Sequence, residues 1–388
     1  MSSTIIDALN ALDQTLFPRL EEEINEESLF RYLKVLSDTH APYQTAAWTR
    51  GRALERLLAE DGYLERPNFE LRRNYKNTGD TLLLLGSEER KKKIWLLAHL
   101  DTITYLVEPG SNGRYPLTPI CYHLMEDGER PAVALGYNLE SRGYEILAHG
   151  QIVSNKDELY FKPDNQAELR PGTRVVFDSQ LVWDRESGEV RGSLDDAAGA
   201  TALVMAARFL ADYDIELMLG LTDEEEGLAG MGSQSICRGG LRLLPHFDQP
   251  SLVIASDIHE STDMYGGGGP DGFVQGQGAS FTEKASGGLG EITPPHLYEL
   301  QRQLSKELSG VGIQLRENLG GYVSRTEGVN AMYRTPNVAL IGFLGANRHF
   351  QRDVESANIH DLVNIAKTVV CYVLLTETPV WQQVQLDS

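Results

Sequence analysis

The spacing of hydrophobic residues changes three times along the chain. Up to about residue 60, apolar residues recur at helical spacing, as in Leu16, Leu20 and Ile24, which predicts amphipathic helices. Three short apolar runs with strand character follow, at residues 68–73, 80–85 and 92–99. The last run is continuously apolar and ends in polar residues, which is typical of a buried strand with polar side chains at its carboxyl end.

Between about residues 104 and 190, glycine and proline separate short alternating segments, and a convincing helical pattern is missing. Examples are YEILAHGQIVS at 144–154 and GTRVVFDSQLVW at 172–183. This pattern predicts a small all-β module built from hairpins.

Beyond residue 190, helical and strand patterns alternate. Helices are expected at 196–213, at 293–310 and from about Asn358, and strands at 215–222, 251–256, 313–318 and 337–345. The alternation predicts an α/β sheet with helices on both faces. We therefore expect one α/β domain, made of residues 1–103 and 191–388, that is interrupted by an all-β insertion of residues 104–190.

The composition is that of a folded globular protein with an excess of acidic residues. Of the 388 residues, 41% are hydrophobic and 23% are charged, which excludes disordered and collagen-like chains. The formal net charge is −21. Because such a surface repels phosphate backbones and anionic lipids, neither nucleic acid nor membrane is expected as a partner. The acidic excess is expected to be mostly solvated surface, with some carboxylates left to hold cations.

The three cysteines, Cys121, Cys237 and Cys371, are far apart and form no CxxC pair. Neither a disulfide framework nor a cysteine-based zinc site is therefore expected. No run of about 18 apolar residues suggests a membrane span, and the start of the chain lacks the pattern of a signal peptide. Together these features favour a cytoplasmic protein.

Acidic residues and histidines gather where the predicted strands end or a helix begins. The set comprises His99, Asp101, Asp195, Asp196, Asp223, Glu224, Glu225, Glu226, Asp257 and His349. Each segment also has an ordinary interpretation as a helix cap, a solvated face or a turn. However, the carboxyl ends of strands in an α/β sheet converge in space. Two histidines and several carboxylates there supply nitrogen and oxygen ligands for a pair of divalent ions.

The order HxD, DD, EExG, D and H resembles that of the cocatalytic two-zinc exopeptidases, a clan of aminopeptidases, carboxypeptidases and deacylases. Within this clan, the chain is most similar to the glutamyl-aminopeptidase and TET (tetrahedral) aminopeptidase family. The similarity lies in the insertion between HxD and DD, and in the segments LRPGTRVVFDSQLVW, EEEGLAG and DIHESTD, the last followed by GGGGP. It covers about residues 80–375. Ala197 stands where the family's DDR triplet has arginine, and the acidic residue after His349 comes late, at Asp353 or Glu355.

The resemblance implies a mixed-sheet, three-layer αβα catalytic domain with an inserted small β-barrel-like domain. It implies that His99 and Asp257 hold one metal, that Glu225 and His349 hold the other, and that Asp195 bridges both. Glu224 is then the general base, which activates a metal-bridging water as nucleophile, and Asp101 orients His99.

These roles describe a metallo-aminopeptidase that acts on peptides with a free amino terminus. Two divalent ions are expected, with zinc as the default and cobalt or manganese as substitutes. A deacylase or carboxypeptidase-like amidohydrolase of the same clan is one alternative, and a non-catalytic scaffold with a peptidase fold is another. The resemblance also implies a large homo-oligomer, such as a dodecameric shell, with the insertion at its interfaces.

Three further residues have ordinary expected places. His259 is expected either behind Asp257 or in a loop, and His360 at the start of the last helix. Arg348 is expected in a surface ion pair, or alternatively on a carboxylate of the substrate.

Overall fold

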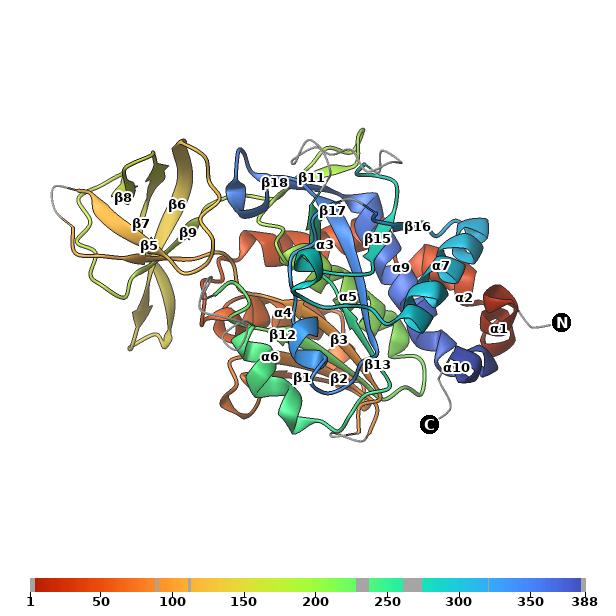
Figure 1. Cartoon of the computed structure of the whole chain (residues 1–388). Helices are drawn as coiled ribbons and strands as arrows, with labels where there is room; N and C mark the ends of the chain where they lie inside the picture. The colour runs from red at the N-terminus through yellow and green to blue at the C-terminus, as the bar shows by residue number, and fades with distance from the viewer. Residues whose placement is uncertain are drawn as a thin grey trace.

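A mixed β-sheet with helices packed against both faces forms the larger part of the molecule (Figure 1). The computed structural model describes residues 4–87, 89, 91–110, 113–227, 237–260, 274–319 and 321–384. In these ranges the main sheet has nine strands, in the order β1-β2-β12-β3-β13-β17-β15-β16, with β14 paired to β17. The strands are β1 (Phe69–Arg73), β2 (Thr81–Leu85), β3 (Ile94–His99), β12 (Leu217–Thr222), β13 (Leu252–Ala255), β14 (Ile258–Glu260), β15 (Ala279–Thr282), β16 (Leu315–Glu317) and β17 (Val338–Gly345).

The centre of this sheet is parallel. Strands β12, β3, β13 and β17 run in the same direction, whereas β1, β2 and β15 introduce antiparallel pairs. The carboxyl ends of the four parallel strands therefore meet at one edge. His99 ends β3, and Asp257 and His349 follow β13 and β17 at the same edge.

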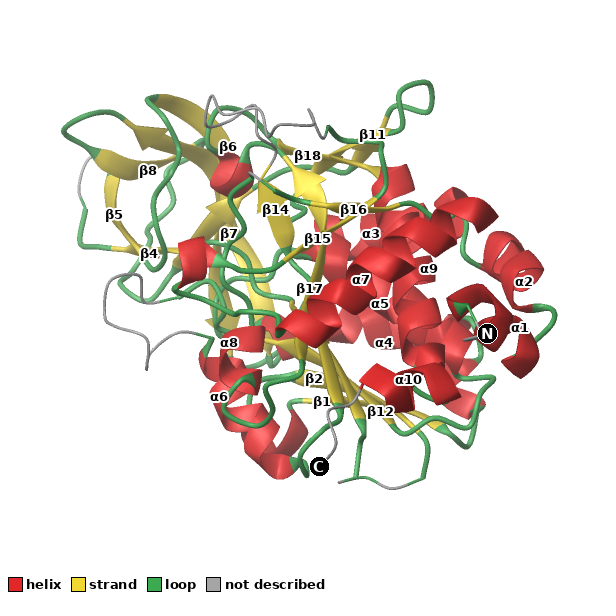
Figure 2. Cartoon of the chain, turned by 45° about the vertical axis from the view of Figure 1, so that its right-hand side comes forward, coloured by secondary structure: helices red, strands yellow, loops and turns green. Residues whose placement is uncertain are grey.

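Alternating side chains of the strands pack into two separate hydrophobic cores. Leu96 and Leu219 face the larger core, whereas Trp95 and Met218 face the smaller one, because successive side chains on a strand point to opposite faces. The larger core is covered by many of the helices, which Figure 2 shows gathered on one side of the sheet. The helices are α1 (Ile5–Leu12), α2 (Leu16–Glu23), α3 (Glu26–Asp38), α4 (Arg50–Glu60), α5 (Ala197–Leu210), α7 (Pro295–Leu308), α9 (Ile359–Leu375) and α10 (Pro379–Val384).

The smaller core is closed by the short helices α6 (Arg238–Leu243) and α8 (Gly328–Ala331). Helices thus cover both faces of the sheet, which makes three layers. The expected mixed α/β fold is confirmed in this part of the chain. Helix α9, capped by the side chain of Asn358, also begins at the expected residue, with His360 in its first turn.

Six further strands form a closed barrel in the order β4-β5-β8-β7-β6-β9. They are β4 (Tyr105–Val107), β5 (Tyr115–Pro119), β6 (Gly128–Asn138), β7 (Gly143–Ser154), β8 (Leu159–Pro163) and β9 (Arg174–Phe177). The barrel forms a lobe of its own at the end of the molecule opposite the two termini (Figure 1). The expected barrel-like insertion is confirmed, since these strands enclose a hydrophobic core that includes Phe161 and Val175.

The segment after the barrel does not join the barrel but pairs with a strand that precedes α9. Strands β10 (Val182–Trp183) and β11 (Glu189–Gly192) form a three-stranded sheet with β18 (Glu355–Asn358). The domain boundaries at residues 104 and 190 stay a prediction.

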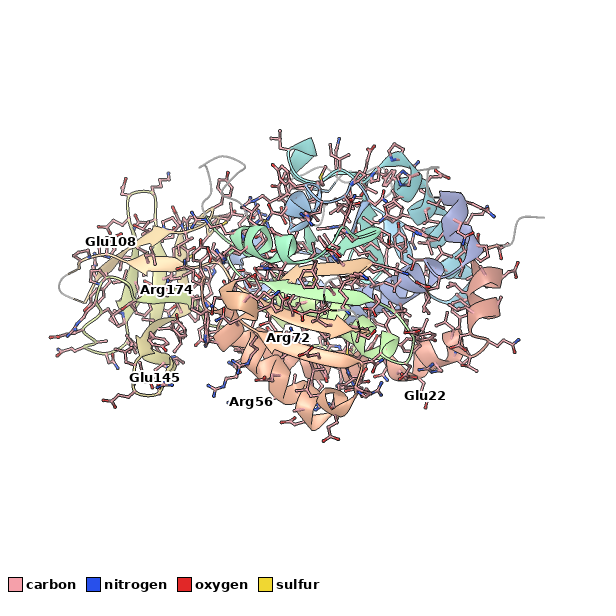
Figure 3. The ribbon with its side chains drawn as sticks, turned by 90° about the horizontal axis from the view of Figure 1, so that it is seen from below. Glu22, Arg56, Arg72, Glu108, Glu145 and Arg174 are labelled. Atoms are coloured by element: carbon pink, nitrogen blue, oxygen red, sulfur yellow. The ribbon has the colours of Figure 1, made fainter. Side chains whose placement is uncertain are left out.

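Side chains of β9 make two of the contacts that dock the barrel on the rest of the molecule. Arg174, labelled on the barrel in Figure 3, donates hydrogen bonds to the backbone oxygen of Tyr43 and to Oε1 of Gln44, each 2.9 Å long. On another side, Phe177 stacks on Phe350, with ring centroids 4.4 Å apart. Because Phe350 follows His349 directly, the second contact brings the barrel to the candidate site.

A buried arginine ties the N-terminal helices to the same edge of the sheet. Arg50 is fully buried and donates hydrogen bonds to the backbone oxygens of Leu36 and Leu100 and to the hydroxyl of Ser193. Leu100 lies between His99 and Asp101 in the sequence, and Ser193 lies just before Asp195. Arg50 therefore fixes the backbone beside two segments of the site.

None of the helices in the described ranges combines the length and the hydrophobicity that crossing a membrane requires. The three cysteines are free and buried, as expected for a chain without a disulfide framework.

Candidate metal centre

The two histidines of the site lie on either side of one carboxylate. Nε2 of His99 is 3.1 Å from Oδ1 of Asp195, and Nε2 of His349 is 3.8 Å from Oδ2 of the same residue. All three residues are almost completely buried. The structure therefore places Asp195 between the two histidines.

The two aspartates that precede α5 have different surroundings. Asp196 caps the helix, since its Oδ1 accepts a hydrogen bond from the backbone N–H of Gly199. Its Oδ2 has no hydrogen-bond partner. The helix-cap interpretation thus applies to Asp196, and Asp195 faces the histidines.

Two consecutive glutamates after β12 also point into the cluster. Oε2 of Glu225 is 4.0 Å from Nε2 of His99, and Oε1 of Glu226 is 3.0 Å from Nε2 of His349. Glu226 belongs to the acidic run identified in the sequence, but no specific role was predicted for it. The only signal for it was its place in the acidic run, because the direction of each side chain depends on the turn that follows β12.

The carboxylate of Glu224 is held by other side chains. The hydroxyl of Tyr43 donates a 2.9 Å hydrogen bond to one oxygen, and Arg242 contacts the other oxygen at 2.6 Å. The backbone of Glu224 is left-handed, with φ 66°. Unlike Glu225 and Glu226, Glu224 does not line the pocket at the cluster.

Asp257 joins the cluster from the loop between β13 and β14. Its Oδ1 is 4.0 Å from Nε2 of His99, and its Oδ2 accepts a 3.3 Å hydrogen bond from Ser324. His259, two residues further on, points elsewhere, with its Nδ1 2.7 Å from the hydroxyl of Ser280.

Two buried carboxylates around the cluster hold its backbone. Asp101 accepts hydrogen bonds from the backbone N–H groups of Glu225 and Glu226, and its Oδ1 lies 3.6 Å from Nδ1 of His99. Nδ1 of His99 is also 3.0 Å from the backbone oxygen of Asp101. This contact fixes the ring so that Nε2 faces the carboxylates.

The second such carboxylate belongs to Glu355. It accepts hydrogen bonds from the backbone N–H groups of Leu194, Asp195 and His349. The other acidic residue that follows His349, Asp353, lies at the surface and pairs with Arg191. Of the two candidates for the late acidic position, Glu355 is therefore the one at the site.

Burial and mutual repulsion shape the charges of the cluster. Burial, together with Asp195 and Asp196, raises the pKa of Asp257 well above its usual range. Burial also raises the pKa of Glu225 to about 8, against the opposing effect of Arg325 and His99. Burial alone would lower the pKa of His99, but the carboxylates around it raise that pKa well above its ordinary value.

Glu226 has the opposite shift because of its cationic neighbours. Burial opposes its ionisation, but His349, His99 and Arg348 together hold its pKa below the ordinary value. The side chain of Arg348 is 11% exposed, with Nε 2.6 Å from Oε1 of Glu260 and Nη1 2.9 Å from Nε2 of His349. The prediction of a surface ion pair for Arg348 is therefore wrong. The pair is internal, because Glu260 is buried and the loop after β17 packs against the barrel through Phe350 and Phe177.

The donor set fits divalent cations. Ligand atoms of His99, Asp195 and Glu226 lie within 4.8 Å of one another, as do those of His99, Asp196 and Asp257. All of these residues are buried. Nitrogen and carboxylate donors at such spacing suit zinc and similar ions. A bound cation also offsets the cost of burying several carboxylates together.

A small pocket lies at the cluster. It is lined by Asp195, Glu225, Glu226 and Asp257, and also by Tyr122 and Arg325. Nε of Arg325 is buried without a hydrogen-bond partner. The glycine-rich GGGGP loop and the LAG residues of the EEEGLAG segment lie outside the described residues.

No protein-family model matches the sequence, and no curated protein sequence matches it. Solved structures do share its fold. An aminopeptidase from the archaeon Desulfurococcus kamchatkensis is similar, with a TM-score of 0.70 and 18% identity over 93% of this chain and 99% of that chain. A TET aminopeptidase from a marine sediment Thaumarchaeota archaeon has a TM-score of 0.68 and 14% identity, over 89% and 96%. The TET1 peptidase of Pyrococcus horikoshii has a TM-score of 0.66 and 16% identity, over 89% of this chain and 99% of that chain.

This chain has the fold of the TET aminopeptidases. The resemblance drawn from the motifs is confirmed for the fold. At these identities the similarity extends no further than the fold.

A buried carboxylate outside the cluster, that of Glu291, holds the segment that follows Arg325. Oε1 of Glu291 accepts hydrogen bonds from the backbone N–H groups of Thr326 and Val329 and from the hydroxyl of Thr326. Oε2 is buried without a partner. Burial raises the pKa of Glu291 to about 7, well above the ordinary value of 4.5.

The raised pKa of Glu291 makes stability depend on pH. In the unfolded chain this carboxyl ionises near pH 4.5, whereas the folded protein keeps its proton until about pH 7. The folded state therefore binds more protons in this window, and the free energy of unfolding falls as the pH rises through it. Between pH 5 and pH 8, we expect the wild type to lose about 2–3 kcal/mol that Glu291→Gln retains.

Urea unfolding of both proteins at the two pH values measures this difference. Glu299→Gln on the exposed side of α7 is the matched control, and it should follow the wild type. Parallel pH dependence of the wild type and Glu291→Gln would contradict the prediction.

Proposed function

We propose that this protein is a dinuclear metal-dependent aminopeptidase that removes N-terminal residues from peptides. The observation that carries the proposal is the buried cluster in which His99, Asp195 and His349 meet the carboxylates of Glu225, Glu226 and Asp257. Several of the structures that share the fold are aminopeptidases, which supports the choice of reaction.

His99 and Asp257 would hold one metal, with Asp195 between the two positions. At the other position, His349 would be joined by Glu226, whose Oε1 is 3.0 Å from Nε2 of His349, or by Glu225, as the resemblance implies. Zinc is the default ion, and cobalt or manganese would be accepted by the same donors. When bound, such ions polarise a carbonyl group and lower the pKa of a water molecule.

The general base is one of two neighbouring glutamates. The resemblance gives this role to Glu224, and that assignment stays a prediction. We favour Glu225, because its carboxylate lines the pocket whereas that of Glu224 is engaged by Tyr43 and Arg242. In this position the carboxylate of Glu225 would take a proton from the attacking water and pass it to the leaving amine.

The remaining residues orient and shield these groups. Asp101 fixes both His99 and the backbone of the two glutamates, and Glu355 fixes Asp195 and His349. Arg325 lines the pocket, and its buried Nε has no hydrogen-bond partner. It is placed to bind an oxygen of the peptide, because a guanidinium prefers carbonyl or carboxylate partners.

Two matched substitutions test which glutamate is the base. With metals retained, Glu225→Gln should reduce kcat by about 10²–10⁴-fold, the usual contribution of a general base. Glu224→Gln should stay within about fivefold of the wild type, because it loses only a contact to Tyr43 or Arg242. Steady-state kinetics on a peptide with a free amino terminus provide the comparison. The reverse pattern would assign the base to Glu224.

Metal content and substrate choice test the reaction class. We expect two divalent ions per chain at saturation, loss of activity on chelation, and recovery when zinc, cobalt or manganese is added. Peptides with a free amine should be cleaved, and N-blocked peptides should not. Cleavage of N-acyl or C-terminal substrates instead would favour a deacylase or a carboxypeptidase-like enzyme. Inactivity with full metal occupancy would favour a non-catalytic scaffold.

We further propose that the protein is a homo-oligomer. Among the proteins that share the fold, the Pyrococcus horikoshii TET1 peptidase can assemble into a tetrahedron or a large octahedral shell, and a related structure is a dodecamer. Sedimentation velocity should therefore give a mass that is a multiple of 43.1 kDa. A monomer across the micromolar range would rule this proposal out.

A further inference from the structure

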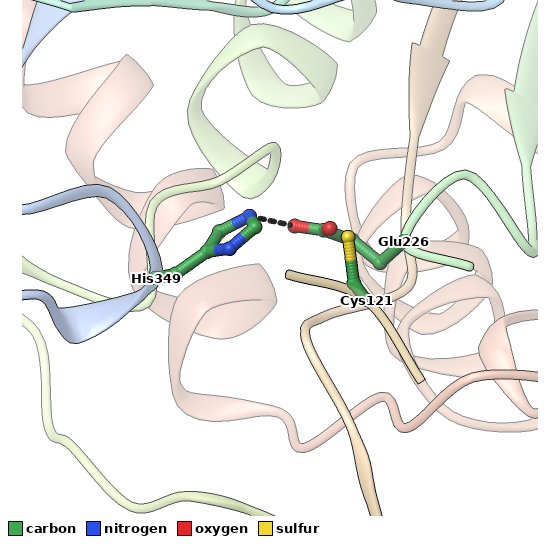
Figure 4. Close-up of side chains that lie close together, drawn as sticks. All are labelled: Cys121, Glu226 and His349. Carbon is green, nitrogen blue, oxygen red and sulfur yellow. Dashed lines mark ion pairs between the residues drawn. The ribbon is translucent and has the colours of Figure 1, made fainter. Parts of the chain in front are cut away.

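A cysteine thiol lies inside the candidate metal centre. Sγ of Cys121, a carboxylate oxygen of Glu226 and a ring nitrogen of His349 lie within 4.8 Å of one another, and all three residues are buried. Figure 4 shows the sulfur beside the Glu226 carboxylate, which in turn faces the imidazole of His349. This thiol was not expected at a metal, because Cys121 belongs to the inserted barrel and has no cysteine close to it in the sequence.

The segment that carries Cys121 is attached to the same histidine. The backbone oxygen of Tyr122 lies 3.0 Å from Nδ1 of His349, and the backbone N–H of Glu126 donates to the backbone oxygen of Gln351. With Nδ1 engaged by the carbonyl of Tyr122, the proton of a neutral imidazole resides there, and Nε2 presents its lone pair to the cluster. The loop after β5 thus orients His349 and places a sulfur next to it.

The three donors match one divalent ion. Imidazole nitrogen, carboxylate oxygen and thiolate sulfur are all common zinc ligands, and a thiolate favours zinc over manganese or magnesium. Nε2 of His349 also lies 2.9 Å from Nη1 of Arg348, whose Nε is anchored on Glu260. Metal binding here therefore displaces one contact of Arg348 and leaves the other in place.

We propose that Cys121 is a ligand of the metal held by His349 and Glu226, so that the inserted barrel supplies a sulfur donor to the catalytic metal centre. This inference rests on the metal centre of the proposed function. It adds a thiolate to a set of histidines and carboxylates, and it makes one of the two metal positions selective for zinc. The thiol loses its proton to solvent when the ion binds, and no oxidant or reductant is needed.

Cobalt substitution of the full-length protein tests the proposal through a spectrum. Bound Co²⁺ gives visible d–d absorption with any ligand set, whereas a sulfur ligand adds an intense thiolate-to-cobalt charge-transfer band in the near ultraviolet. We expect the cobalt-loaded wild type to show both. Cys121→Ser and Cys121→Ala should keep the d–d absorption and lose the charge-transfer band.

Two other cysteines provide matched controls. Cys237 is buried near the site, with Sγ 3.4 Å from Oε1 of Glu225, and Cys371 is buried in α9. Cys237→Ala and Cys371→Ala should both retain the charge-transfer band. Loss of the band in Cys237→Ala, with retention in Cys121→Ser, would overturn the assignment to Cys121.

The wild-type spectrum separates the two proposals and needs no variant. Cobalt d–d absorption without the charge-transfer band would refute the thiolate ligand and leave the metal centre standing. Failure to bind cobalt at all would refute the metal centre itself, and with it the ligand.

Metal selectivity provides a second measurement. Cys121→Ser should weaken zinc binding at one of the two positions by at least about tenfold, since even a lost partner outside the coordination sphere costs about 10–100-fold. Manganese binding should change much less, because a thiolate contributes little to its affinity. Competition with a chromophoric chelator measures both affinities. An unchanged ratio of zinc to manganese affinity would contradict the proposal.

Discussion

The arrangement of this protein depends on one electrostatic constraint, which is that several carboxylates must be buried together at one edge of a sheet. Asp195, Glu225, Glu226 and Asp257 share a space with little access to water. Removing each charge from water is costly, and mutual repulsion adds to that cost. His99, His349 and Arg348 offset part of it. The remainder requires either bound protons or bound cations.

Backbone hydrogen bonds keep this unfavourable cluster in place. Asp101 accepts from two consecutive N–H groups after β12, and Glu355 accepts from three N–H groups in two different loops. These two carboxylates therefore join segments that are far apart in the sequence. Arg50 adds a third connection, from the N-terminal helices to the residues beside Asp101 and Asp195. These contacts tie the site to several segments of the α/β part of the chain.

The periodicity of the sequence was sufficient for the fold and for residues at strand ends. His99, Asp257 and His349 follow strands that are buried on both faces, and the ends of parallel strands meet for geometric reasons. The direction of the Glu226 side chain could not be predicted. If the turn after β12 were one residue longer or shorter, a neighbouring side chain would point into the cluster instead. The position of Cys121 at the cluster and the low exposure of Arg348 depend on how the barrel docks. No local sequence pattern encodes that contact. For the acidic position after His349, the sequence left two candidates, Asp353 and Glu355. It could not distinguish them, because the difference lies in their tertiary contacts.

The backbone contact between Tyr122 and His349 connects the barrel to a ligand of the candidate centre. If a metal occupies that position as proposed, docking of the barrel and binding of the ion would share one free energy of interaction. If docking raises the affinity for the ion by some factor, the ion must strengthen docking by the same factor. Any assembly that clamps the barrel would then retain its metal at concentrations where an isolated chain releases it.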